Sequence, residues 1–196
     1  MEEHSRREPL SQLKEAPEPA AGPPVDPELL AVVSAQLGRP ARAVRRVAHS
    51  CGCGLPDVVE TSPRLADGTP FPTLYYLTCP RAAKEVSRLE SGGMMREMTD
   101  RLAREPELAA AHARANEDYL RRRDALGRLP GDPTAGGMPG RVKCLHVLVA
   151  HALAAGPGVQ PLGDEALAAM PDWGSDGPCV DPAPLELGPS GSGPTG

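Results

Sequence analysis

The stretch "DGTPFPTLYYLTCP", Asp67 to Pro80, decides the fold and raises the question of function. Three of the five aromatic residues in the chain fall within six positions of it. The segment "PFPTLYYLT" is aromatic, β-branched and apolar on both faces, which predicts a strand that is buried on both sides. Cys79 follows where a helix N-cap would stand, and Pro80 suits the first helical position. The sequence therefore predicts a buried strand that runs into a helix, with a cysteine at the junction.

The neighbouring segments extend this pattern. In "VDPELLAVVSAQLGRP", Asp26 as N-cap, Pro27 and the terminal Gly38 delimit a helix. "AVRRVAH" and "DVVET" predict two more short strands. Further helices are expected at 80–91, at 94–128 with a break at Pro106, and at 141–156, whose almost wholly apolar sequence indicates a central position. We expect an α+β fold, a mostly helical single domain with a small sheet of two to four strands.

The two ends of the chain differ from its middle. Residues 1–25 are charged and rich in proline, and residues 174–196 are mainly Gly, Pro and Ser. Neither composition buries enough apolar surface to offset the entropy of ordering, so both are predicted to be disordered tails. The single domain is then expected to span residues 26–173.

Charge and hydropathy narrow the class of protein. The formal net charge of −5 argues against a nucleic-acid or membrane-surface binder, since both need a basic excess. The basic run "RPARAVRR" is accordingly read as a solvated face. No run approaches the roughly 18 apolar residues of a membrane span, and the N-terminus lacks a secretory signal. We expect a cytoplasmic protein, in which cysteines are reduced thiols or metal ligands.

Four cysteines are the first candidates for a site: Cys51 and Cys53 in the Gly-rich turn "CGCG", Cys79, and Cys144 in "KCLH". Four thiolates suit tetrahedral zinc or an iron–sulfur cluster, in a site that is either structural or redox-sensing, and three or four of these residues would have to converge from separate segments. The alternative is that they are inert, packed thiols. Cys179 lies in the predicted tail and is excluded.

His146 or His151 could replace one cysteine. On a regular helix Cys144 and His151 share a face, but they are about 10 Å apart along the axis, which is far for one ion. His146 can join Cys144 only if Cys144 precedes the regular helix. The alternative for each histidine is an imidazole with an ordinary hydrogen-bond partner.

Two functions without a metal remain open. Unpaired N–H groups at a helix start would lower the pKa of Cys79 and activate it as the thiol of an enzyme. The Cys-x5-Arg spacing of thiol phosphatases is absent, because Glu85 occupies the required position. The charged helix 94–128 could instead serve as the docking face of a protein-interaction module.

The segments "CGCGLPDVVETSPRLADGTPFPTLYYLTCP" and "GGMPGRVKCLHVLVAHALAAGPGVQPLGDEAL" resemble a bacterial family known as domain of unknown function 501. The likeness covers roughly residues 28–170. The family has no established activity, so the resemblance implies none for this chain. The residues that match its motifs are Cys51, Gly68, Pro70, Phe71, Pro72, Thr73, Thr78, Cys79, Pro80, Lys143, Cys144, His146 and His151.

Overall fold

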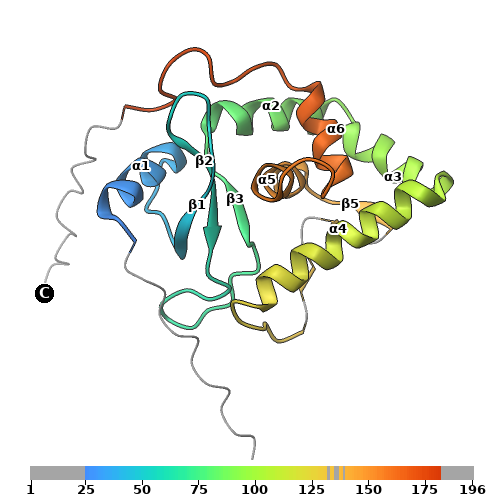
Figure 1. The fold of residues 1–196 in the computed structure, drawn as a ribbon, viewed down its shortest axis with the longest axis horizontal. Coiled ribbons are helices and arrows are strands. Elements are labelled where there is room, and N and C mark those ends of the chain that lie inside the picture. Colours follow the sequence, from blue (N-terminus) through green and yellow to red (C-terminus); the bar gives the residue numbers. More distant parts are fainter. Residues whose placement is uncertain (1–24, 132, 135–136, 139, 182–196) are drawn as a thin grey trace, which may run out of the picture.

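The structure is a computed structural model, and it describes residues 25–131, 133–134, 137–138 and 140–181 (Figure 1). Of the predicted tails 1–25 and 174–196, residues 1–24 and 182–196 lie outside the described residues. In chain order the elements are α1 (Pro27–Leu37), β1 (Val44–Ser50), β2 (Pro56–Thr61), β3 (Tyr75–Leu77), α2 (Pro80–Ser91), α3 (Met94–Arg104), α4 (Pro106–Asp124), β4 (Gly137–Met138), β5 (Arg141–Val142), α5 (Leu145–Ala155) and α6 (Pro161–Ala169).

The main sheet is antiparallel with strand order β1-β2-β3, and β4 and β5 form a separate two-stranded ribbon. Every residue of the central strand β2 is buried. The predicted α+β fold with a small sheet is confirmed. The strand β3 is shorter than the predicted "PFPTLYYLT", because Pro70 and Pro72 have no N–H to give to a ladder.

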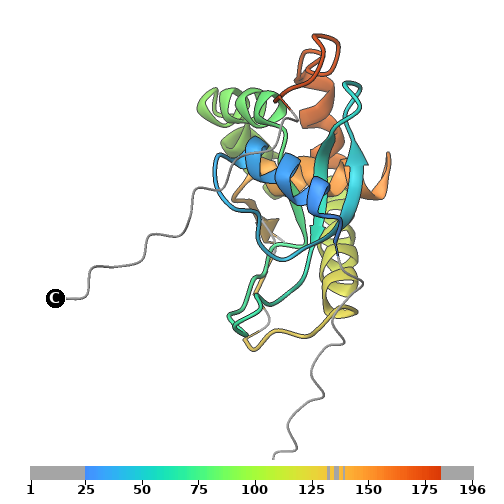
Figure 2. The ribbon, with the colours of Figure 1, turned by 90° about the vertical axis from the view of Figure 1, so that its left-hand side faces the viewer.

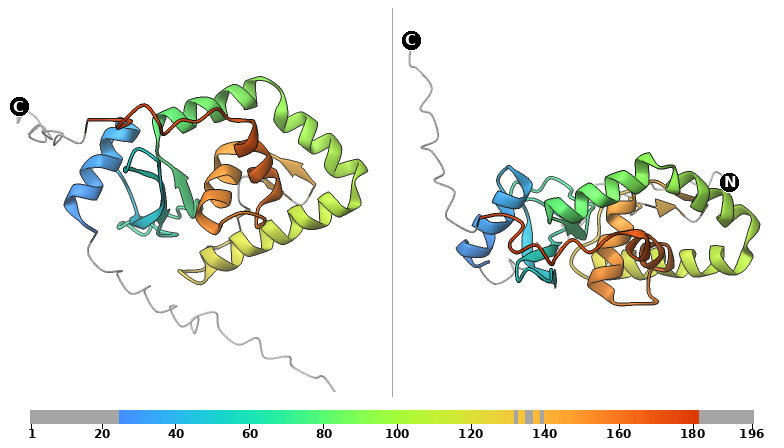
Figure 3. Two further views of the ribbon diagram at one scale, coloured as in Figure 1. Left: turned by 45° about the horizontal axis from the view of Figure 1, so that its top comes forward. Right: turned by 90° about the horizontal axis from the view of Figure 1, so that it is seen from above.

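The sheet lies between α1 and α5, as Figures 1 and 3 show from two directions. The predicted caps of α1 are present: the Asp26 carboxylate accepts a hydrogen bond from the Glu28 N–H, and Gly38 ends the helix at φ 64°. The helix α5 is central, as predicted. It packs against β3, α2 and α6, and most of its residues are buried.

The helices α2, α3 and α4 form an outer arc around α5 (Figure 1), and Figure 2 shows α1 in front of the sheet. Gly93 adopts φ 93° between α2 and α3, a left-handed conformation that favours glycine. The predicted break at Pro106 is confirmed, since Glu105 is extended and Pro106 begins α4. Docking of a partner on the two charged helices α3 and α4 stays a prediction. Among the described residues, no helix is both long and apolar enough to span a bilayer.

The residues after α6, 171–181, form the C-terminal segment, which runs back across α2 toward the β1–β2 turn (Figures 1 and 3). Arg81 of α2 donates hydrogen bonds to the backbone carbonyls of Asp176, Gly177 and Pro178 at 3.3, 2.9 and 3.1 Å. Contacts with the domain thus continue through Cys179, beyond the boundary expected at 173. Hydrogen bonds to the backbone help to hold this segment, and the side chains of Trp173 and Cys179 pack against the core.

Candidate functional site

The structure does not gather the six predicted ligand residues around one point, and the single expected site is corrected accordingly. Cys144 and His146 form one group, together with a glutamate that the sequence did not suggest. Cys51, Cys53 and Cys79 lie near the β1–β2 turn and the start of α2. His151 lies apart from both groups, in the core.

Cys144 and His146 can face one ion because Cys144 precedes the regular helix. Its backbone is extended, with φ −158° and ψ 118°, and α5 begins at Leu145. The sequence allowed Cys144 and His146 to share an ion only if Cys144 preceded the regular helix, and the structure meets this condition. The predicted helix 141–156 is correspondingly shorter at its start, because Arg141 and Val142 pair with β4.

Glu90, in the last turn of α2, completes the group. Its Oε1 accepts a hydrogen bond from the Leu145 N–H at 2.7 Å and lies 3.3 Å from His146 Nδ1. A glutamate from another helix thus satisfies a free N–H at the start of α5. One ligand atom from each of Glu90, Cys144 and His146 lies within 4.8 Å of the other two, and all three residues are partly exposed.

The surroundings of the His146 imidazole favour its charged form more than water does. A hydrogen bond with Cys144 raises the pKa of His146 above its ordinary value, and the carboxylate of Glu90 adds to this effect. Burial opposes the rise but does not cancel it. The group therefore attracts positive charge to the position between its three members.

A cleft with a volume of about 610 Å³ opens beside the group. Cys144 and His146 line it, whereas Tyr75 and Tyr76 from the opening stretch form part of its wall. The remaining lining is mostly apolar, with a few hydroxyl and amide groups. Its members are Gln36, Leu37, Thr73, Leu77, Thr78, Pro80, Ala83 and Val147.

Sequence reasoning missed Glu90 because no local pattern marks it. It stands in "RLESGG", where it reads as one more charge on a solvated helix. The available signal was indirect: the predicted start of a buried helix after Cys144 needs an acceptor for its first N–H groups.

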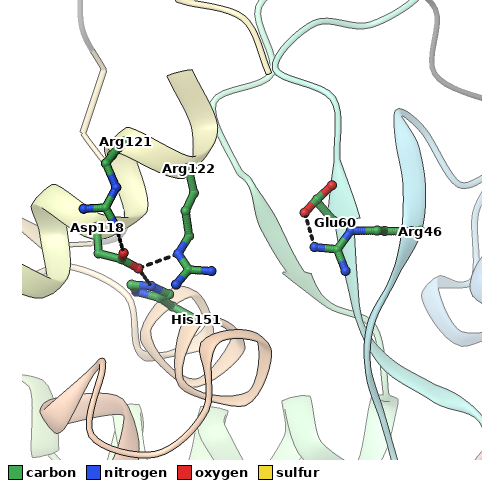
Figure 4. A network of polar contacts seen from close by, with 6 residues as sticks. All are labelled: Arg46, Glu60, Asp118, Arg121, Arg122 and His151. Atoms are coloured by element: carbon green, nitrogen blue, oxygen red, sulfur yellow. Dashed lines mark hydrogen bonds and ion pairs between the residues drawn. The ribbon is translucent and has the colours of Figure 1, made fainter. Parts of the chain in front are cut away.

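His151 is a core residue and not a ligand of either group. Its ring is 1% exposed, and Nε2 lies 3.1 Å from Oδ2 of Asp118, which also pairs with Arg121 and Arg122 (Figure 4). The ring stacks on Tyr75 at 5.9 Å and 18°. Burial lowers the pKa of His151 even though Asp118 favours the charged form. His151 is therefore an imidazole with an ordinary hydrogen-bond partner, which is the alternative that the sequence left open.

Cys79 is the N-cap of α2, as predicted, but it is not an activated thiol. It is fully buried, and this burial raises its pKa to about 12 although the N–H groups of Ala82 and Arg81 act in the opposite direction. Desolvation therefore raises the pKa of Cys79 by more than the N–H groups at the start of α2 lower it. The exclusion of Cys179 is also corrected: it is partly buried against the core and interacts with Cys53 and Cys79.

The fold and the site define an α+β protein with a thiol, an imidazole and a carboxylate at the edge of a largely apolar cleft. The chain belongs to the family described as "Protein of unknown function (DUF501)", whose model matches residues 47–168. This match confirms the resemblance drawn from the sequence motifs. No match was found among the curated proteins or the solved structures.

Proposed function

We propose that the protein binds a divalent metal ion, with zinc the best fit, between Glu90, Cys144 and His146. The observation that carries this proposal is the mutual distance of at most 4.8 Å among one oxygen, one sulfur and one nitrogen ligand atom. Two of them are close in sequence, whereas the third comes from the facing helix α2.

The donor set supports zinc over an iron–sulfur cluster at this position. Zinc takes cysteine sulfur, histidine nitrogen and carboxylate oxygen together, whereas clusters are held mainly by cysteine thiolates. Only one thiol belongs to this group. The hydrogen bond from the Leu145 N–H orients the Glu90 carboxylate, which is the role that outer contacts play around metal ligands.

Three protein ligands leave one position of a tetrahedral ion open, which is typical of catalytic zinc and not of structural zinc. Cys144 and His146 line the cleft, so a small molecule held there would lie next to that position. Such an ion polarises a carbonyl or phosphoryl oxygen or lowers the pKa of a bound water. The apolar lining favours a substrate with a hydrophobic part beside its polar group.

The proposal is tested by measuring zinc binding to the purified, reduced protein by isothermal titration calorimetry and elemental analysis. We expect His146→Ala and Cys144→Ser to weaken zinc binding at this site by more than about 100-fold, because each removes a ligand. Glu90→Gln also weakens it, but its amide oxygen can still accept the Leu145 N–H.

Glu85→Gln is the matched control for Glu90→Gln. Glu85 lies on the same helix and pairs only with the exposed Arg88 in the described contacts, so its loss should leave zinc binding unchanged. Equal zinc binding in wild type, His146→Ala and Cys144→Ser would overturn the proposal.

The same contacts favour a second function, thiol chemistry at Cys144. Cys144 lies within 4.8 Å of His146, which brings a nucleophile close to a base, and Glu90 lies 3.3 Å from Nδ1 of the same imidazole. A nucleophile, a base and a carboxylate that lie this close together are the parts of a thiol enzyme. The sequence had placed this role on Cys79, whose burial argues against it.

Alkylation by iodoacetamide separates the two functions. A thiol enzyme requires Cys144 to react faster than the other thiols in metal-free protein at pH 7, and to slow by about 10-fold or more in His146→Ala. A metal site requires zinc to protect Cys144 from the reagent. Fast labelling that zinc leaves unchanged would favour the enzyme over the metal site.

A further inference from the structure

Four of the five cysteines meet at a second place, which the site beside the cleft does not use. Electrostatic interactions link their side chains one after another: Cys51 with Cys53, Cys53 with Cys179, and Cys179 with Cys79. They come from the β1–β2 turn, the start of α2 and the C-terminal segment. We call these four residues the thiol cluster.

Two contacts hold the C-terminal segment next to the thiol cluster. The guanidinium of Arg81 binds the three carbonyls that immediately precede Cys179. Gly174 lies so close to the turn that a Cβ there would stand 3.1 Å from Cys51 Sγ. The C-terminal segment is thus in contact with the cluster at both of its ends.

N–H donors are directed at the sulfur atoms. The Leu55 and Cys179 N–H groups face Cys53, and the Arg81 and Ala82 N–H groups face Cys79. Gln36 Nε2 lies 3.3 Å from Cys179 Sγ. Thiols that only fill space need no donors, whereas metal-bound thiolates are oriented by such outer contacts.

A buried carboxylate beside the cluster also favours a cation there. Asp57 is fully buried, and its electrostatic effect reaches Cys51. One of its oxygens contacts His49 Nδ1 at 2.7 Å, and the other, Oδ2, has no hydrogen-bond partner among the described residues. Thiolates next to this carboxylate would repel one another unless a positive ion lay among them.

We propose that the thiol cluster is a second metal site, in which Cys51, Cys53, Cys79 and Cys179 bind one zinc ion and fasten the C-terminal segment to the domain. Four cysteines and no open position make a structural site, unlike the mixed group beside the cleft. The ion links three parts of the chain that are distant in sequence.

Binding requires the four sulfurs to close around the ion. Among the described residues, only the Glu90 group has all ligand atoms within 4.8 Å of one another, so the thiols form a chain of neighbours and not a ring. Zn–S bonds of about 2.3 Å require sulfurs about 3.8 Å apart in a tetrahedron. Cys53 and Cys179 are partly exposed, and their side chains can turn to close the ring.

The test uses Co²⁺ as a spectroscopic substitute for zinc in the reduced, full-length protein. Tetrahedral cobalt–thiolate centres absorb strongly in the visible, with an intensity that grows with the number of sulfur ligands. We expect a high-sulfur spectrum in wild type and in Cys144→Ser. Cys179→Ser and Cys53→Ser should lose it, with cobalt affinity at the cluster lower by more than about 100-fold.

Trp173 supplies an independent readout, because it is the only tryptophan and stands at the start of the C-terminal segment. Zinc should change its fluorescence in wild type and in Cys144→Ser, but not in Cys179→Ser. Circular dichroism checks that each variant is folded.

The proposal is overturned if folded wild type gives no cobalt–thiolate spectrum, if Cys179→Ser retains it, or if the protein carries the brown colour of an iron–sulfur cluster. Loss of zinc only in Cys144→Ser would support the cleft site and overturn this one.

Discussion

His146 and His151 lie five residues apart on α5, yet they occupy opposite environments. His146 is partly exposed, beside Cys144 and the cleft, and its pKa is raised. His151 is buried between two tyrosine rings, and its pKa is lowered. The two imidazoles face different neighbours, α2 for His146 and α4 for His151.

This contrast teaches that the packing partner decides what a histidine does. On one side of α5 the partner provides a carboxylate within reach of solvent and a thiol, so the ring remains available to a ligand. On the other side the partner surrounds the ring, so it acts as a core residue with one hydrogen bond. The helical spacing in the sequence shows that the two rings point apart, but not which one is buried.

The largest expected effect is on the buried side. His151→Ala should lower the free energy of unfolding by about 3 kcal/mol, because it leaves a cavity between Tyr75 and Tyr119 and removes one partner of Asp118. His146→Ala should lower it by less than about 0.5 kcal/mol. Urea unfolding of both metal-free variants measures the difference, and equal losses would break the comparison.

A second, smaller effect tests how tightly the buried side of α5 packs. A Cβ added at Gly163 of α6 would stand 2.3 Å from the Leu148 carbonyl oxygen, so Gly163→Ala must push the helices apart. We expect a loss of about 2 kcal/mol in urea unfolding. Gly140→Ala is the control, since nothing lies within 4 Å of its added Cβ. A neutral Gly163→Ala would show that α6 is not held close to α5.

The third effect is the dependence of stability on pH. The pKa of His151 is lowered in the folded state, chiefly by burial, so the unfolded chain binds more protons as the pH falls below about 6.5. Asp118, Arg122 and Asp164 are the charged groups that act on this ring. Stability should therefore decline from about pH 6.5 toward the folded pKa, by at most about 1.4 kcal/mol per pH unit from this group.

The variant His151→Gln isolates this contribution, because it removes the titrating ring. Its stability should change less between pH 7 and pH 5 than that of wild type. Chemical unfolding at a series of pH values measures both. An undiminished decline in His151→Gln would assign the acid sensitivity to other groups.

Local signals in the sequence predicted much of the fold. The caps Asp26 and Gly38, the break at Pro106 and the apolar composition of α5 each act within a few residues, so the pattern was sufficient. The extent of β3 was wrong, because proline in the opening stretch outweighed β propensity.

The candidate site was predictable only in part. Residue type and helix geometry identified Cys144 and His146, together with the condition on where α5 begins. Glu90 and Cys179 were missed because their roles depend on contacts with distant segments. Cys179 is placed by a side chain that binds backbone carbonyls, and every residue has a carbonyl, so the pattern of residues around it gives no signal.

The grip of Arg81 on the chain has a consequence for how this region tolerates change. It recognises carbonyl oxygens and not side chains, so Asp176 and Pro178 can be exchanged for many other residues without loss of the contact. Insertion or deletion of a single residue between Trp173 and Cys179 is different, since it shifts the thiol out of register with its neighbours. In this segment the number of residues is constrained more strongly than their identity.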